Sequence, residues 1–119
     1  MSLPCIIPGC KAPVPEELAS LGMCISHCTL EIERQCTEMR LETARGTTAP
    51  ERRDEIFRFI GQQGGLLARV ATGTPRLPDE IKARILSTFL TLMNLRENVE
   101  RAAARAAPSA PASATPAKR

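Results

Sequence analysis

The feature that most constrains this chain is a pair of metal-ligand spacings near its start. Cys5 and Cys10 form a C-x4-C pair, and Cys24 and His27 form a C-x2-H pair. Each pair is close enough in sequence to bind one ion, and three cysteines with one histidine are an accepted ligand set for structural zinc. The spacing therefore predicts one Zn²⁺ ion bound by Cys5, Cys10, Cys24 and His27.

The residues around these ligands favour the same interpretation. Pro8-Gly9 is a turn signal that lets the chain fold back between the first two cysteines. Gly22 can leave the ordinary backbone conformations just before the second pair. Cys24 and His27 are three residues apart and would share one face of a helix, whose N-terminus stabilises a thiolate.

The sequence leaves alternatives to this site open. The cysteines could instead be buried as small apolar side chains, be paired in a disulfide, or hold an iron–sulfur cluster. A further alternative keeps zinc but replaces His27 with its neighbour Cys28, which gives an all-cysteine site.

C-x4-C followed by G-x-C-x2-H resembles a small zinc motif of three cysteines and one histidine that recurs in bacterial and phage proteins, sometimes beside nuclease or DNA-binding domains. The matching positions are Cys5, Pro8-Gly9-Cys10, Gly22, Cys24 and His27. The resemblance covers residues 5–27, and it implies zinc binding by the same four residues. After His27 the pattern departs from the motif, because Cys28-Thr29-Leu30 stands where an aromatic and a basic residue are usual.

Length and composition indicate how the segment with the four ligands, called the hook below, fits into the whole chain. With 119 residues there is room for one domain, and 43% hydrophobic residues with 3% aromatic residues predict an aliphatic core. We expect a zinc hook at about 1–28, continuous with a helical bundle at about 24–107, and a disordered tail rich in Pro, Ala and Ser at 108–119. Five cysteines without a signal-peptide pattern favour the cytoplasm, and no apolar run is long enough to cross a membrane.

Three helices are predicted, so the expected fold is mainly α, with the zinc knuckle packed on a three-helix bundle. The first helix runs from near Cys24 to about Arg45, and Gly46 follows it as a C-terminal cap. Residues 48–51 fit a capping box for the second helix. Residues 78–80 open the third, with Pro78 at its first position.

Two features of the later helices need a physical reason. Gly61, Gly64 and Gly65 interrupt the second helix, which predicts a kink or a close helix crossing rather than a phosphate-binding loop. From Ile85 to Leu95 the third helix has an apolar face too broad for one small bundle to enclose, which favours self-association. The predicted core comprises Ile32, Met39, Ile56, Ile60, Leu67, Ile85, Phe89 and Leu92.

Charge and ligand chemistry favour a binding module over an enzyme. The only histidine is assigned to the metal, and four protein ligands leave no open position on zinc for hydrolysis. The net charge is +3, and acidic residues interrupt most basic ones, so the broad basic field of a nucleic-acid binder is missing. We expect a protein partner or a second copy, with no membrane or small-molecule substrate.

Two alternatives to that function are open. The first is a small nucleic-acid-binding regulator that would use Arg52, Arg53 and Arg58 with Lys11. The second is a redox sensor with an easily oxidised ligand set.

Overall fold

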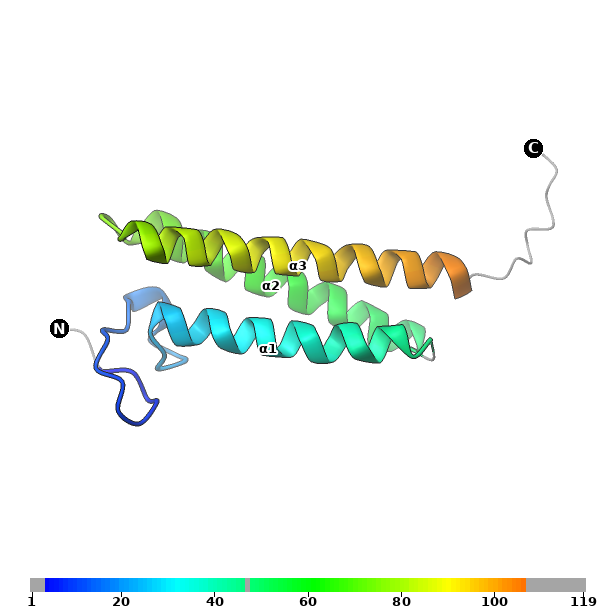
Figure 1. Ribbon diagram of the computed structural model, residues 1–119, viewed down its shortest axis with the longest axis horizontal. Coiled ribbons are helices and arrows are strands. Elements are labelled where there is room, and N and C mark those ends of the chain that lie inside the picture. The colour runs from blue at the N-terminus through cyan, green and yellow to red at the C-terminus, as the bar shows by residue number, and fades with distance from the viewer. Residues whose placement is uncertain (1–3, 47, 107–119) are drawn as a thin grey trace.

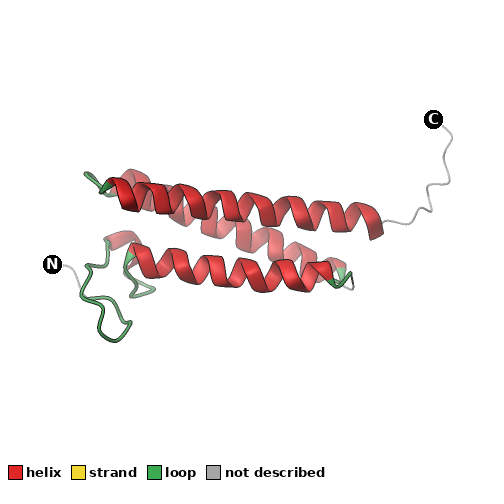
Figure 2. Ribbon diagram, in the orientation of Figure 1, coloured by secondary structure: helices red, strands yellow, loops and turns green. Residues whose placement is uncertain are grey.

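The computed structural model describes residues 4–46 and 48–106, in which three long helices follow a short hook (Figure 1). α1 spans Ile25–Ala44, α2 spans Pro50–Gly73, α3 spans Asp79–Ala106, and one 3-10 turn, η1, spans Glu16–Leu18. These residues contain no strand, and an isolated antiparallel bridge joins Pro4 to Pro13 (Figure 2). The predicted mainly helical fold is confirmed. The predicted tail at 108–119 lies outside the described residues.

The third helix holds the bundle together. α1 and α3 run in the same direction and α2 runs opposite to them (Figure 1). α3 packs along both α1 and α2. The hook lies at the end where α1 and α3 begin, so the candidate metal ligands are far from the C-terminal ends of these two helices. None of the described helices is both long enough and apolar enough to span a bilayer.

Both ends of α1 follow the chemistry of its sequence. Cys24 is the N-terminal cap, and its Sγ accepts a hydrogen bond from the backbone N–H of His27 at 3.5 Å. At the other end Gly46 has a φ of +78°, and its N–H donates to the Thr43 carbonyl at 3.0 Å. Glycine enters this left-handed conformation without a steric penalty, which explains why the helix ends there.

The starts of α2 and α3 differ from the prediction. Ala49, not Thr48, caps α2, and no side chain makes a capping hydrogen bond. The Thr48 hydroxyl instead donates to the Glu42 carbonyl at 3.4 Å, so the predicted capping box is wrong. α3 begins at Asp79, one residue after the expected position, with the Pro78 carbonyl accepting from Ile81 and Lys82.

The glycines of α2 neither break the helix nor form a loop. The helix is continuous from Pro50 to Gly73. A Cβ added at Gly64 would meet the Phe89 ring at 3.8 Å, an ordinary van der Waals distance, and one added at Gly61 would meet open space. Of Gly61, Gly64 and Gly65, Gly64 alone meets another helix, and even there a methyl group would fit.

The core is aliphatic, as the composition predicts. Six of the eight predicted core residues are buried: Ile32, Ile56, Ile60, Leu67, Ile85 and Leu92. The other two, Met39 and Phe89, are partly buried and pack against the edge of the core. Leu18 of η1 is buried in the same core, so the hook shares it with the helices.

A polar layer crosses the interface between α1 and α3. Thr29 and Thr88 are fully buried. Arg84 Nε donates to the Thr29 hydroxyl at 2.9 Å, and the Thr88 hydroxyl donates to a Glu33 carboxylate oxygen at 2.7 Å. Among the described residues no buried side-chain nitrogen or oxygen lacks a partner. The layer thus fixes how α1 and α3 meet without leaving polar atoms unsatisfied.

Candidate metal centre

The hook is folded by two glycine-dependent turns. Gly9 has a φ of +84°, and the following Cys10 N–H donates to the Ile7 carbonyl at 3.0 Å. Gly22 has a φ of +71°, and its carbonyl accepts from the Ile6 N–H at 2.8 Å. A Cβ at Gly22 would lie 2.7 Å from Ile6 Cγ2, so the turn excludes a side chain as well as favouring glycine. These turns bring the segment that carries Cys5 beside the start of α1.

The hook is also anchored away from the ligands. The 3-10 turn η1 packs against α2. Its Leu18 is 1% exposed, and the Leu18 carbonyl accepts from the Gly22 N–H at 3.0 Å. Val14 is buried in the same cluster. Apolar packing therefore positions the segment between the two ligand pairs.

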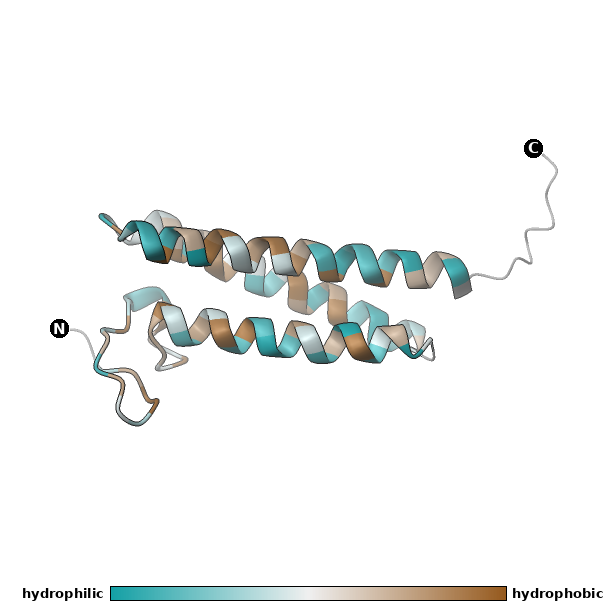
Figure 3. Ribbon diagram, viewed as in Figure 1, coloured by the Kyte–Doolittle hydropathy of each residue, from teal (hydrophilic) through white to brown (hydrophobic). Residues whose placement is uncertain are grey.

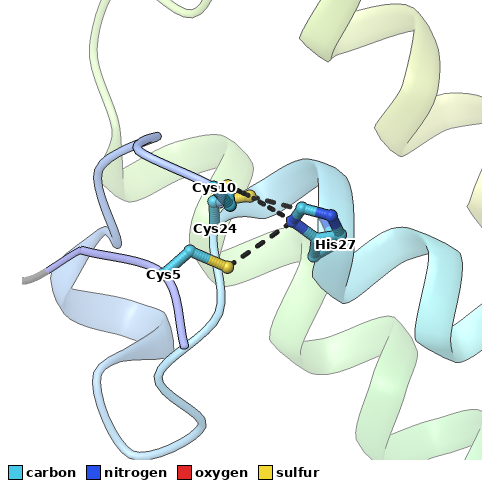
Figure 4. A group of neighbouring side chains, drawn as sticks. All are labelled: Cys5, Cys10, Cys24 and His27. Atoms are coloured by element: carbon cyan, nitrogen blue, oxygen red, sulfur yellow. Dashed lines mark hydrogen bonds between the residues drawn. The ribbon is translucent and has the colours of Figure 1, made fainter. Parts of the chain in front are cut away.

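Four ligand atoms converge where the hook meets the first turn of α1 (Figure 4). The Sγ atoms of Cys5, Cys10 and Cys24 and a ring nitrogen of His27 all lie within 4.8 Å of one another. His27 Nδ1 is 3.5 Å from Cys5 Sγ and 3.3 Å from Cys24 Sγ, and the Sγ atoms of Cys10 and Cys24 are 3.9 Å apart. The structure thus brings together the four residues singled out from the spacing.

Three of the separations in this group are close to the edges of a zinc tetrahedron. Zn–S bonds of about 2.3 Å and Zn–N bonds of about 2.0–2.1 Å place two sulfurs about 3.8 Å apart and a sulfur and a nitrogen about 3.6 Å apart. The observed sulfur pair at 3.9 Å and the sulfur–nitrogen pairs at 3.5 and 3.3 Å lie within 0.3 Å of these lengths. The group is therefore close enough to hold a single metal ion.

The electrostatics of the group favour a cation. Burial raises the pKa of the Cys24 thiol, and the nearby thiols of Cys10 and Cys5 raise it further although the His27 N–H opposes them. Burial also acts to raise the pKa of Cys5, but backbone N–H groups of Cys24 and Ile7 and the neighbouring thiols lower it to about 6. The lowered pKa favours the thiolate form of Cys5. A bound cation would reduce the repulsion between this thiolate and a second thiolate at Cys24.

The remaining cysteines do not join this group. Cys28 is buried in the bundle core and is not one of the four mutually close ligand atoms, so the all-cysteine alternative gains no support from the geometry. Cys36 is also buried, about two helical turns further along α1. Burial raises the pKa of both thiols, that of Cys36 to about 11. Both side chains are buried in the apolar core, and a raised pKa disfavours the reactive thiolate form.

The residues considered for nucleic-acid contact lie on two separate elements, the hook and α2. Arg52 donates to Glu42 at 2.8 Å and to Glu55 at 3.0 Å, so its charge is used to join the end of α1 to the start of α2. Lys11 lies in the hook, whereas Arg53 and Arg58 lie on α2. The four residues do not gather at the candidate metal centre.

The comparisons with known proteins add no name to this site. No protein-family model, curated protein or solved structure matches the chain. The Cys₃His group therefore stands on its own geometry. The contact between Glu33 and buried Thr88 could not be predicted from the sequence, because Glu33 is one of many charged residues along α1.

Proposed function

We propose that Cys5, Cys10, Cys24 and His27 bind one Zn²⁺ ion and that the protein is a non-catalytic, zinc-stabilised helical interaction module. The observation that carries this proposal is the set of four ligand atoms within 4.8 Å of one another, with three of their separations close to tetrahedral edge lengths. Four protein ligands fill the coordination shell of zinc, which is typical of a structural site. The likeness of residues 5–27 to bacterial and phage zinc motifs supports the same metal.

The protein environment supports zinc over a purely apolar role for these cysteines. Cys10 and His27 are only half-buried, so their polar atoms are reachable from solvent. The hook residues 4–24 contain one short 3-10 turn and few backbone hydrogen bonds. Apolar packing of Leu18 and Val14 anchors only the middle of this segment, and structural zinc would add on the order of 10 kcal/mol, the value found in small metal-binding peptides.

A protein partner is favoured over nucleic acid. Arg34, Arg52, Arg96 and Arg101 each lie within 4.0 Å of an acidic side chain. Phosphate binding depends on a concentrated basic surface that releases counterions. The exposed leucines of α3 offer the kind of surface that another helix covers. Thiol ligation in the cytoplasm, where cysteines stay reduced, fits the same function.

Metal analysis of the purified protein tests the proposal. We expect one zinc per chain by native mass spectrometry and elemental analysis, and complete loss of bound zinc in Cys10→Ser. Cys28→Ala is the matched control, since Cys28 lies beside the site but outside the ligand group, and it should keep the metal. A wild-type chain that is metal-free after growth with zinc, or a Cys28→Ala chain that loses zinc, would contradict the ligand assignment.

A further inference from the structure

α3 carries a stripe of large apolar side chains that the bundle does not cover. Leu86, Leu90 and Met93 are 60%, 58% and 41% exposed. They are spaced four and three residues apart, so they lie on one face of the helix. The core residues Leu92 and Leu95 point away from this face, since they are buried in the bundle. Hydrophobic residues gather in the middle of α3 and hydrophilic ones toward its C-terminal end (Figure 3).

The apolar stripe, Leu86, Leu90 and Met93, continues into a groove between α3 and α2. This groove has a volume of about 470 Å³, and its lining combines apolar side chains, among them Leu77, Ile85, Leu86 and Phe89, with polar ones that include Arg76 and Lys82. Leu86 therefore belongs to both the stripe and the groove. A side chain from a partner that crosses the stripe at Leu86 would find a partly apolar hollow beside it.

The two ends of the stripe carry opposite charges. Lys82 precedes Leu86 by four residues and Glu97 follows Met93 by four, so both share the face of the stripe. At 1.5 Å per residue they are about 22 Å apart along the helix. Glu97 also lies 3.5 Å from Arg101 in an exposed pair. A face with a cation at one end and an anion at the other is complementary to itself when a second copy is turned end to end.

We propose that the apolar stripe of α3 binds the same stripe of a second copy in an antiparallel dimer. The twofold axis passes between Phe89 and Leu90, which places Leu86 opposite Met93 of the second copy and Lys82 opposite its Glu97. In a parallel dimer Lys82 would face Lys82 and Glu97 would face Glu97, so charge selects the antiparallel arrangement. The inference rests on the proposed interaction function and names its partner.

The extent of the interface follows from its neighbours. One step beyond Lys82 and Glu97, Asp79 would face Glu100 of the second copy, a pair of like sign. Glu100 is held 3.2 Å from Arg96, which reduces this repulsion. The complementary contact is therefore limited to residues 82–97. One helix face of this length buries less than the roughly 1,200 Å² of a standard interface, so we expect a dissociation constant of about 1–100 µM.

Sedimentation of the zinc-loaded full chain from about 1 µM to about 1 mM tests the dimer, because this range brackets the expected constant. Wild type should pass from monomer to dimer, and Leu90→Glu should stay monomeric. Leu41→Glu is the matched control, since Leu41 is 52% exposed on α1, away from the stripe, and it should dimerise like wild type. Zinc content and helicity measured on each variant show that the chains are folded.

A charge exchange tests the orientation. Lys82→Glu and Glu97→Lys should each weaken the homodimer by about tenfold at low salt, because each creates two like-charge pairs. Mixing the two variants should restore association, since both charge pairs are opposite in the mixed dimer. A wild-type chain that stays monomeric throughout the range, or two variants that do not associate when mixed, would overturn the proposal.

The two proposals fail separately. A zinc-loaded monomer would refute the dimer and leave the metal site standing. A metal-free dimer would support the α3 interface and refute the zinc site.

Discussion

The hook and the bundle are ordered by different physics. Residues 4–24 have one 3-10 turn and one isolated bridge, and their defining feature is a meeting of four metal-binding side chains. α2 and α3 bury isoleucine, leucine and valine side chains, and α1 buries Ile32 together with cysteines and threonines. Leu18 and Val14 anchor the hook in the shared apolar core, and the proposed metal would add a local point of order, whereas the bundle depends mainly on apolar burial. The two regions should respond to different perturbations.

Removal of the proposed zinc ion should have the largest effect, and we expect it to be confined to the hook. Structural zinc contributes on the order of 10 kcal/mol of apparent binding free energy, which the hook has no regular structure to replace. With a chelator we expect the Ile6 N–H, bonded to the Gly22 carbonyl, to lose protection in hydrogen exchange, while Leu92 amide protection persists. Loss of all helicity on chelation would show instead that the bundle depends on the hook.

The converse substitution is Leu92→Ala in the bundle. Leu92 is fully buried, so its truncation should lower the free energy of unfolding by about 2–5 kcal/mol. Zinc stoichiometry should not change. Denaturant unfolding followed by circular dichroism measures the effect, with Leu41→Ala as an exposed control expected to stay within about 0.5 kcal/mol of wild type. Equal destabilisation by the two substitutions would place Leu92 outside the core.

A smaller effect is expected from the polar layer between α1 and α3. Thr88→Val removes the hydroxyl that donates to Glu33 at 2.7 Å while keeping the side-chain shape. We expect a loss of about 1 kcal/mol in the free energy of unfolding, the usual net value of such a bond. Glu33→Gln keeps an acceptor for the same hydroxyl and should cost less. If Thr88→Val is neutral, the layer specifies helix pairing without stabilising it.

The smallest effect should be the acid dependence of the ion pair at the far end. A hydrogen bond from Arg52, together with its charge, lowers the pKa of Glu42 below 4.5 although burial opposes this. A depressed carboxyl pKa stabilises the fold above the unfolded value, and this stability is lost as the pH falls through the folded value. Because both side chains are about one-third exposed (33% and 37%), we expect about 0.2–1 kcal/mol.

The measurement is the difference in unfolding free energy between wild type and Glu42→Gln. It should be greatest near neutral pH and vanish in acid below the folded pKa of Glu42. Taking the difference between the two chains cancels any effect of acid on the metal site, since both chains share it. A difference that does not change with pH would show that the pair contributes nothing.

Much of this structure could be predicted from the sequence, because the sequence patterns that determine it are local. The ligand spacings, Gly9 and Gly22 act within a few residues of one another, and Gly46 ends α1 through its own backbone conformation. The predicted capping box failed because Thr48 had a competing acceptor, the Glu42 carbonyl, at the end of the preceding helix. Hydrogen bonds of this kind depend on how the chain returns, which spacing alone does not encode.

Exposure was harder to predict than helicity. Phe89 and Leu90 are adjacent and equally apolar, yet Phe89 packs against the core while Leu90 is 58% exposed. Their difference depends on where α2 lies relative to α3. Glu33 likewise looks like any other charge on α1 until Thr88 is placed beside it, 55 residues later in the chain. The breadth of the apolar face on the third helix was visible in sequence, but not which part of it stays uncovered.

Cys24 has a consequence for how the chain folds, because it caps α1 and also belongs to the ligand group. Helix nucleation is unfavourable, with an equilibrium nucleation parameter near 10⁻³, because the dihedral angles of a whole turn are fixed for a single hydrogen bond. A metal held by Cys24 and His27 would fix that very turn. Zinc uptake would then seed α1 from its N-terminus, and stopped-flow circular dichroism of urea-unfolded chain refolded with and without zinc would show a faster helical phase with the metal.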